Sequence, residues 1–421
     1  MKIALLLHNA YGIGGTIRTT MNLATALADR HEVEIVSMMR HRETPRFTLD
    51  PRVRLVPLVD TRSDGPDAKD PLFDEDSRDF PSAEKRHHQY SRLIDVRAAE
   101  YLRGSDPDVI IGTRPGVNVY LARFGPRRAL RIAQEHLRHD AHSKKLLAEL
   151  APYYRTLDAV VTTTEADAAV YRAKMPLPGV RTLAIPNSVP EPAVEPSEGT
   201  APVIAAAGRL VRGKRFELLI DAFSEIAPKH PDWRLRIYGG GAEKERLQER
   251  IERLGLSGSA ALMGSYSPIE EEFAKASLVA VASDAESFGM TIVEAMRCGV
   301  PVVSTDCPLG PGEIIQDGVT GRLVPTGDKQ ALATALLELI DDEPGRRAMG
   351  AAALESARTY DPAPIAWRYE RLFEELASSR KARAWERTRS LARARAGRLV
   401  RRCTAAFRRR RTPAAGGKAG A

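Results

Sequence analysis

One local pattern recurs along most of this chain: a short apolar run, a turn rich in glycine or polar residues, and then a helical period. The first case spans residues 3–36, where Ile3–Leu7 precedes the loop NAYGIGG, a predicted helix over 16–28 and the apolar run EVEIV. Apolar runs without alternation, separated by helices, are typical of strands buried on both faces of a parallel sheet. The sequence therefore predicts an α/β fold built from βα units.

A proline-rich stretch divides this pattern into two halves. Residues 189–202 read VPEPAVEPSEGTAP and show no period, which is typical of an extended linker. Apolar runs resume at once, and 421 residues are too many for one core. We therefore expect two doubly wound Rossmann-like domains that face a cleft, over residues 1–189 and 190–360. A helix over 361–380 is expected to pack back on the first domain, followed by a basic tail over 381–421 that is disordered or amphipathic.

Two carboxylates stand in the stretch SDAESFGMTIVE, residues 283–294. Glu286 lies in the loop after a predicted strand, and Glu294 lies in the helix that follows. From there Glu294 can accept two hydrogen bonds from a ribose diol, while Glu286 faces what lies beyond the phosphates of a bound nucleotide. Two ordinary surface glutamates are the alternative explanation of the same spacing.

The start of that helix forms a second part of the candidate site. The backbone N–H groups of Gly289, Met290 and Thr291 would point out of the helix start, where an anion such as a phosphate binds. Gly289 has no side chain that would block the approach of the ligand. The stretch therefore predicts places for a sugar, a diphosphate and a ribose in line.

Two cations follow the first strand of the second half, in the stretch GRLVRGKR. Arg209 offers a planar fork of donors and Lys214 a point charge, and together they suit a diphosphate. A solvated basic loop is the alternative explanation.

A glycine loop near the N-terminus, GIGG, contains Gly14 and Gly15 and follows the first strand. A dinucleotide-binding fingerprint needs a further glycine after these, and the chain continues through Arg18 without one. This difference disfavours a nicotinamide cofactor.

His136 ends a predicted strand of the first half, in the stretch AQEHLRHD, and would face the same cleft. A histidine in that position is a candidate functional residue, and a purely structural histidine is the alternative. A metal site with Glu135, His139 and Asp140 is a third interpretation, but a strand end does not give helical ligand spacing.

The order of these motifs resembles that of a known family. The segments GIGG, IPNSV, GRL with its following lysine, and ESFG are followed by EAMRCGVPVVSTD and GVTGRLVP. In this order they resemble the family-4 retaining glycosyltransferases of the GT-B fold, over roughly residues 1–375. Each motif alone is weak, and their combined order is specific.

The resemblance implies a role for each candidate residue. Arg209 and Lys214 would neutralise the diphosphate of the donor and stabilise it as a leaving group. Glu294 would hold the ribose, Glu286 would contact the donor sugar, and His136 would touch that sugar and support catalysis. The glycine loop would approach the phosphates of the donor and the acceptor. The first domain, residues 1–189, would lie on the acceptor side, and the second, residues 190–360, would bind the nucleotide sugar.

The resemblance also implies the reaction. A hexosyl or N-acetylhexosaminyl group would move from a UDP- or GDP-linked donor to a hydroxyl acceptor with retention of configuration. A phosphate oxygen of the leaving group would take the proton of the acceptor, so no separate base is needed. The stretch DCPLGPGEII resembles members that build cell-envelope polymers, and a glycolipid or a small polyol precursor would also serve as acceptor.

No metal and no cofactor are expected in this reaction. The acidic triplet at 74–76 belongs to the polar segment 60–86, a predicted mobile loop, and the DPD sequence at 106–108 is explained by a turn. A sugar-nucleotide epimerase with the GT-B fold is the alternative enzyme. A polyanion-binding protein that acts through the tail is the alternative outside enzymes.

The net charge of +8 is divided unevenly, since residues 380–421 carry +14 and residues 1–379 carry −6. Bases interleaved with apolar residues over 381–411 predict an amphipathic helix on an anionic membrane surface. Non-specific nucleic-acid binding and a solubilising tail are the alternatives, and no specific nucleic acid is expected. Three scattered cysteines and an N-terminus unlike a signal peptide predict a cytoplasmic protein at the inner face of the plasma membrane.

Overall fold

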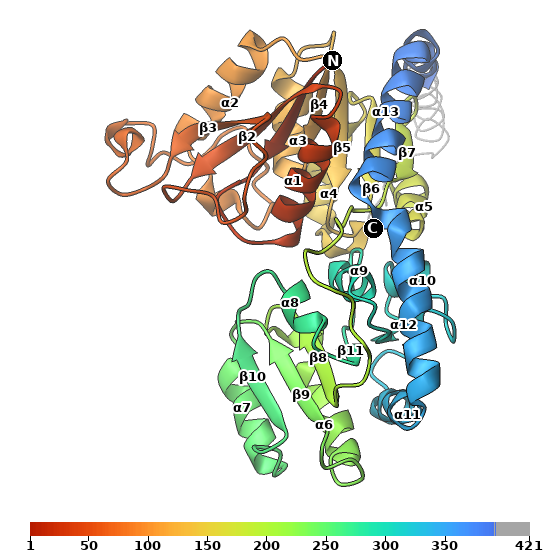
Figure 1. Ribbon diagram of the computed structural model, residues 1–421. Helices are drawn as coiled ribbons and strands as arrows, with labels where there is room; N and C mark the ends of the chain where they lie inside the picture. The colour runs from red at the N-terminus through yellow and green to blue at the C-terminus, as the bar shows by residue number, and fades with distance from the viewer. Residues whose placement is uncertain (391, 393–421) are drawn as a thin grey trace, which may run out of the picture.

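The computed structural model describes residues 1–390 and 392, and these form two domains that are each built on one parallel β-sheet (Figure 1). The strands of the first sheet lie in the order β3 (Val53–Asp60), β2 (Glu32–Arg40), β1 (Lys2–Leu7), β4 (Val109–Gly112), β5 (Leu130–Glu135), β6 (Ala159–Thr162) and β7 (Arg181–Ala184). The strands of the second sheet lie in the order β10 (Ala260–Gly264), β9 (Arg234–Tyr238), β8 (Val203–Ala207), β11 (Leu278–Val281), β12 (Val302–Thr305) and β13 (Gly321–Val324).

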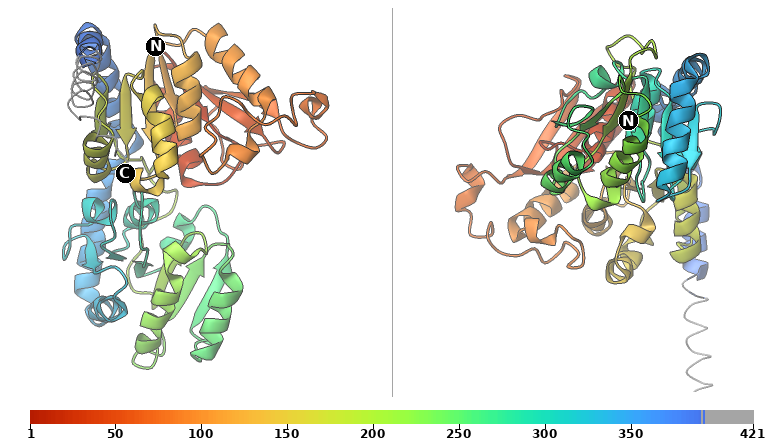
Figure 2. Two further views of the ribbon diagram at one scale, coloured as in Figure 1. Left: turned by 180° about the vertical axis from the view of Figure 1, so that it is seen from behind. Right: turned by 90° about the horizontal axis from the view of Figure 1, so that it is seen from below.

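Helices cover both faces of each sheet, as the views from behind and from below also show (Figure 2). In the first domain, one face carries α1 (Gly15–Leu27) and α13 (Pro362–Ser378), and the other carries α2 (Arg92–Gly104), α3 (Pro115–Phe124), α4 (Lys144–Tyr154) and α5 (Glu165–Lys174). In the second domain, one face carries α6 (Phe216–Ile226), α7 (Lys244–Arg253) and α11 (Lys329–Asp341), and the other carries α8 (Glu270–Phe273), α9 (Met290–Arg297), α10 (Pro311–Ile314) and α12 (Glu343–Ala357).

Burial on both faces explains the unbroken apolar runs of the strands. The residues from Ile3 to Leu7 in β1 are at most 1% exposed. Such strands gain burial on both sides and are therefore uniformly apolar. The predicted α/β fold with two doubly wound domains is confirmed.

The strand order of each sheet reverses beside its first strand, between β1 and β4 in one sheet and between β8 and β11 in the other. Loops at the carboxyl edges of the two sheets meet. The hydroxyl of Thr163, after β6, donates to the carbonyl of Ser287, after β11, over 2.7 Å. Ligands of open parallel sheets bind outside these edges, so the junction between the domains is the expected site.

The C-terminal part of the chain crosses from the second domain back to the first (Figure 1). Helix α12 packs on the second sheet, and α13 packs on α1 and β5 of the first domain. The carboxylate of Glu370 accepts hydrogen bonds from Arg30 and His31 over 2.8 Å, and Gln134 donates to the hydroxyl of Tyr369 over 2.7 Å. These contacts fasten α13 to the first domain.

The first part of the basic tail, up to residue 390, is helical, as one of the two expectations had it, but it packs against the first domain instead of forming a free surface. Arg383 is buried and donates to Asp158 Oδ1 over 2.7 Å, and Arg387 donates to the carbonyl of Gly179. These two arginines are therefore not part of a free membrane-binding surface. The rest of the predicted amphipathic segment, residues 391 and 393–411, lies outside the described residues.

The polar segment 60–86 also differs from the predicted mobile loop. It contains the short 3₁₀ helix η1 (Pro66–Lys69), and Phe80 is buried in the core of the first domain. The buried carboxylate of Asp95 in α2 accepts hydrogen bonds of 2.5 Å from the hydroxyls of Ser77 and Tyr120. Because a buried carboxylate needs such partners, Asp95 anchors the segment.

We predict that Arg383→Gln lowers the thermal midpoint of unfolding by several degrees. The change leaves the carboxylate of Asp158 buried without its main cation, which lowers the free energy of unfolding by about 3 kcal/mol. The matched control is Lys381→Gln, whose side chain is exposed two positions away. Differential scanning fluorimetry measures both midpoints. Equal midpoints for wild type and Arg383→Gln would contradict the packing of this helix on the first domain.

Candidate active site between the two domains

Two loops of the second domain bring a lysine and a glutamate into contact. Lys214 ends the short 3₁₀ helix η4 (Arg212–Lys214), after β8, and Glu286 lies in the loop between β11 and α9. The Lys214 Nζ atom lies 2.5 Å from Glu286 Oε1, which also accepts a hydrogen bond of 2.7 Å from the hydroxyl of Ser283. The backbone N–H of Asp284 donates to the carbonyl of Gly213 over 3.0 Å and joins the same two loops. Hydrogen bonds within and between the two loops therefore hold Lys214 and Glu286 in contact.

Helix α9 begins beside this pair and presents backbone donors. Gly289 precedes the helix with φ 109° and ψ 49°, a left-handed conformation that favours glycine. The N–H groups of Met290 and Thr291 find no acceptor within the described part of the chain. A free helix start of this kind suits an anion.

The glycine loop of the first domain lies opposite this helix start. A Cβ atom on Gly15 would lie 3.8 Å from the Cγ atom of Met290, so the two segments are neighbours across the junction. Gly14 is extended, with φ 158°, and a Cβ atom there would meet nothing within 4 Å. The loop therefore leaves open space next to the start of α9.

Glu294 lies inside the junction and is paired from the other domain. Arg18 of α1 donates from Nη1 to Glu294 Oε1 over 3.0 Å, and its Nη2 atom forms a second ion pair with Glu270 of α8. Burial raises the pKa of Glu294 to about 7 against the opposing charge of Arg18. This value already includes the charge of Glu270, which raises the pKa, and that of Lys214, which lowers it. Glu294 is thus a buried carboxylate whose charge depends on its neighbours.

Arg209 lies largely exposed in the loop after β8, and Arg86 lies largely exposed in the first domain. Partial burial and the charge of Arg114 lower the pKa of Arg86, Glu84 and Tyr90 raise it, and the charge of Arg209 lowers it as the weakest of these causes. Arg86 donates to Gln89 over 3.0 Å. Two exposed arginines from different domains whose charges reach each other are suited to an anion placed between the domains.

His136 follows β5 at the carboxyl edge of the first sheet, and burial lowers its pKa to about 4. Its Nε2 atom is buried without a hydrogen-bond partner among the described residues. Glu135 points into the first domain instead, where it accepts from Asn118 over 2.9 Å and pairs with His142 over 3.5 Å. His139 and Asp140 contact each other over 3.2 Å and form no metal-binding group with His136 among the described residues.

The structure brings together some of the predicted site residues. Lys214 contacts Glu286, the charge of Lys214 reaches Glu294, and Gly15 neighbours Met290. No group of three His, Cys, Asp or Glu side chains able to hold a metal ion occurs in residues 1–390 and 392.

Three charged residues of the junction were not predicted as site residues: Arg18, Arg86 and Glu270. Arg18 follows the glycine loop and could have been found as a polar residue in the first turn of that helix. Glu270 and Arg86 carry no local signal, because only the tertiary fold brings them to the junction.

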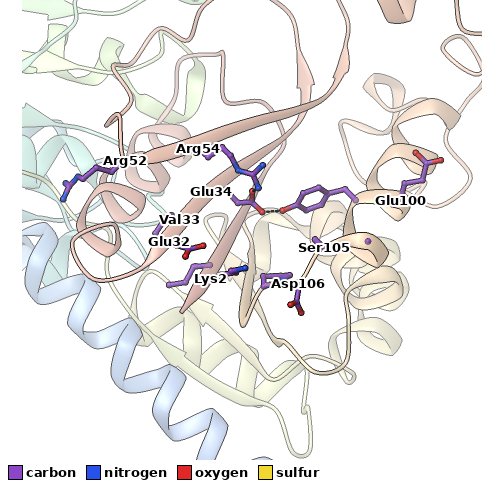
Figure 3. A pocket seen from close by; sticks show the side chains of 13 residues that line it. Lys2, Glu32, Val33, Glu34, Arg52, Arg54, Glu100, Ser105 and Asp106 are labelled. Carbon is purple, nitrogen blue, oxygen red and sulfur yellow. Dashed lines mark hydrogen bonds and ion pairs between the residues drawn. The ribbon is translucent and has the colours of Figure 1, made fainter.

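A hollow of about 610 Å³ lies elsewhere, at the amino edge of the first sheet (Figure 3). Among its lining residues are Lys2, Glu34, Arg54 and Tyr101. Glu34 pairs with both Arg54 and Tyr101, so these three side chains satisfy one another. It also lies at the edge opposite to the one where parallel sheets bind ligands.

Two facing, doubly wound domains joined by a returning C-terminal helix define a GT-B fold. Residues 14–188 match the family model of the glycosyl transferase 4-like domain, and residues 190–356 match that of the glycosyl transferases group 1. The chain therefore belongs to the GT-B glycosyltransferases with a group 4-like first domain.

One relative and two solved structures are similar to most of this chain. The chain is 37% identical to an exopolysaccharide phosphotransferase of Streptomyces coelicolor over 393 residues, which are 90% of this chain and 41% of that relative. The chain thus spans less than half of the relative's length. Sucrose-phosphate synthase of Thermosynechococcus elongatus is similar in structure with a TM-score of 0.73, at 20% identity over 90% of this chain and 99% of that one.

A second solved structure is TarM of S. aureus, a mutant in complex with fondaparinux, α-GlcNAc-glycerol and UDP. Its TM-score is 0.71, at 16% identity over 88% of this chain and 99% of that one. At such identities the two solved structures show the fold alone.

We predict that His136→Gln makes the thermal stability less sensitive to acid. His136 has a pKa of about 4 in the fold and about 6.5 when unfolded, so only the unfolded chain takes up its proton in this interval. Stability is therefore lost as the pH falls from about 6.5 toward 4, and glutamine removes this contribution. Thermal unfolding between pH 7 and 5 measures the slope. The control is His88→Gln, an exposed histidine. A slope for His136→Gln equal to that of the wild type would contradict the burial of the imidazole.

Proposed function

We propose that this protein is a retaining glycosyltransferase that moves a hexosyl or N-acetylhexosaminyl group from a UDP- or GDP-linked sugar to a hydroxyl acceptor. The observation that carries the proposal is the contact of Lys214 with Glu286 beside the free start of α9, opposite the glycine loop of the other domain. A cation, helix N–H groups and a carboxylate at one junction suit a diphosphate with a polyhydroxylated group on either side.

The proposed binding mode assigns one task to each side chain. Arg209 and Lys214 neutralise the diphosphate, with Lys214 exchanging its contact with Glu286 for a phosphate oxygen. Glu286, once released, accepts hydrogen bonds from the donor sugar. The N–H groups at the start of α9 receive the β-phosphate, and Glu294 receives the ribose hydroxyls through its Oε2 atom, which is not bonded to Arg18.

The proposed chemistry needs few groups from the protein. The bond between the anomeric carbon and the β-phosphate oxygen breaks, and the acceptor oxygen forms a bond to the same face of that carbon. The acceptor proton passes to the departing phosphate oxygen. Lys214 and Arg209 stabilise the negative charge that develops on the leaving diphosphate, which is their catalytic contribution. His136 is proposed to contact the donor sugar as a neutral imidazole, in keeping with its lowered pKa.

The acceptor and the location of the protein are also proposals. A cell-envelope polymer, a glycolipid or a small polyol is the proposed acceptor, supported by the relative that is named for exopolysaccharide. Attachment to an anionic membrane is proposed for the tail beyond residue 390. Vesicle co-sedimentation of a protein ending at residue 390 tests it without removing the packed Arg383 and Arg387. None of the described helices has the length and hydropathy to cross a bilayer.

We predict that Lys214→Ala lowers the transfer rate by more than about 10²-fold, because the leaving diphosphate loses a charge partner. The assay offers UDP- and GDP-linked hexoses and N-acetylhexosamines with a hydroxyl acceptor and measures the release of free nucleoside diphosphate. The control is Lys229→Ala, an exposed lysine of the same domain.

Each further outcome of this assay bears on the proposal. Activity is expected to persist in excess chelator, since the proposed reaction uses no metal. Near-normal turnover by folded Lys214→Ala would overturn the assignment of the cation. An epimerised nucleotide sugar formed without acceptor would favour the epimerase instead, and no turnover of any donor would favour the polyanion-binding alternative.

A further inference from the structure

The side chain of Arg18 crosses between the domains and is shared by two carboxylates. It projects from the first turns of α1 in the first domain, and its two terminal nitrogens pair with Glu270 of α8 and Glu294 of α9 in the second domain. The side chains of Glu270 and Glu294 are 5% and 10% exposed. One guanidinium therefore offsets two buried carboxylates.

Arg18 does not satisfy all the oxygen atoms of the two carboxylates. Glu270 Oε2 is buried and has no hydrogen-bond partner among the described residues. Glu294 uses only its Oε1 atom for Arg18. Two like charges placed side by side with one cation are costly, and such an arrangement is expected where a site performs a task beyond stability.

We propose that Arg18 is a positioning residue for donor binding: from the first domain it holds the Glu294 carboxylate in its charged form and in the orientation that receives the nucleotide ribose. The inference rests on the proposed function, in which Glu294 binds that ribose. It adds that donor binding in the second domain requires a residue of the first. A residue of the first domain thus completes the nucleotide site, and the first domain takes part in donor affinity.

Charges from several elements act on Glu294. Arg18 of α1 and Lys214 of η4 favour its charged form, and Glu270 of α8 opposes it. Arg297 and Cys298 lie next to these groups, and burial together with Glu270 and Glu294 raises the pKa of the Cys298 thiol to about 12, so it stays neutral. The ionised carboxylate accepts two hydrogen bonds from a diol, and the protonated acid accepts fewer.

Removing Arg18 and removing the charge of Glu270 should shift the pH midpoint of UDP binding in opposite directions. Removing Arg18 raises the pKa of Glu294, so UDP affinity should reach its high value only at more alkaline pH. Removing the charge of Glu270 lowers the pKa of Glu294, so high affinity should persist to more acidic pH. A purely structural ion pair predicts weaker binding for both variants, with an unchanged pH midpoint.

The experiment is isothermal titration calorimetry of UDP against full-length protein from pH 6 to 9. We expect the affinity of the wild type to fall below a midpoint near pH 7, and that of Arg18→Gln to be reduced by at least about tenfold at pH 7 and to recover toward pH 9. Arg18→Lys, which keeps the charge, should restore the wild-type midpoint. Glu270→Gln should move the midpoint down. The titration of the UDP phosphate is common to all variants and does not affect their differences.

The control for folding and surface charge is Arg30→Gln, which removes an arginine beyond the other end of α1 that pairs with Glu370 on the surface. Its UDP binding should equal that of the wild type. An Arg18→Gln midpoint equal to that of the wild type, or shifts of Arg18→Gln and Glu270→Gln in the same direction, would overturn the inference.

Glu294→Gln separates this inference from the proposed function. If Glu294→Gln weakens UDP binding and removes the part of its pH dependence that the UDP phosphate does not cause, while Arg18→Gln leaves the midpoint unmoved, only the role of Arg18 fails. If UDP binds equally well to Glu294→Gln, the assignment of the ribose to Glu294 fails, and the role of Arg18 fails with it.

Discussion

Parallel strands joined by helical crossovers all end at the same edge of their sheet, and this constraint organises the molecule. Both sheets direct that edge toward the junction, where the loop after β6 contacts the loop after β11 and the glycine loop after β1 neighbours α9. Every candidate residue except Glu294, which lies in the middle of α9, is on such a loop or at the start of the helix that follows it. Loops fixed by a rigid sheet can carry chemistry without contributing to the core.

The junction holds charges that are only partly balanced. Lys214 is matched by Glu286, whereas Arg18 serves both Glu294 and Glu270, and the charge of Arg209 reaches Arg86. Burying the carboxylates of Glu294 and Glu270 costs free energy that packing elsewhere must offset, with unbroken cores on both faces of each sheet. A ligand with a dianionic centre and hydroxyl groups beside it would relieve the repulsion among the cations and use the free helix donors. The electrostatics and the fold thus point to the same class of ligand.

Much of the fold and of the candidate site could be predicted from the sequence, because local sequence patterns determine them. Unbroken apolar runs predict buried parallel strands, and a glycine before a helix predicts an anion site. Tertiary causes leave no local pattern: β7 carries only the short and half-polar RTLA. The segment 60–86 is polar in composition, yet the buried Phe80 and the hydrogen bond of Ser77 to the buried carboxylate of Asp95 anchor it. For the same reason Glu270, which has no motif of its own, was missed.

The central claim is that the junction binds a nucleoside diphosphate with its ribose on Glu294 and its phosphates between Lys214 and the start of α9. A crystal structure of the complex with UDP, or with GDP if that nucleotide binds, tests it most directly. The account predicts ribose hydroxyls within hydrogen-bond distance of Glu294 and a β-phosphate facing the N–H groups of Met290 and Thr291. A nucleotide bound in the hollow at the amino edge of the first sheet, or with its ribose away from Glu294, would contradict it.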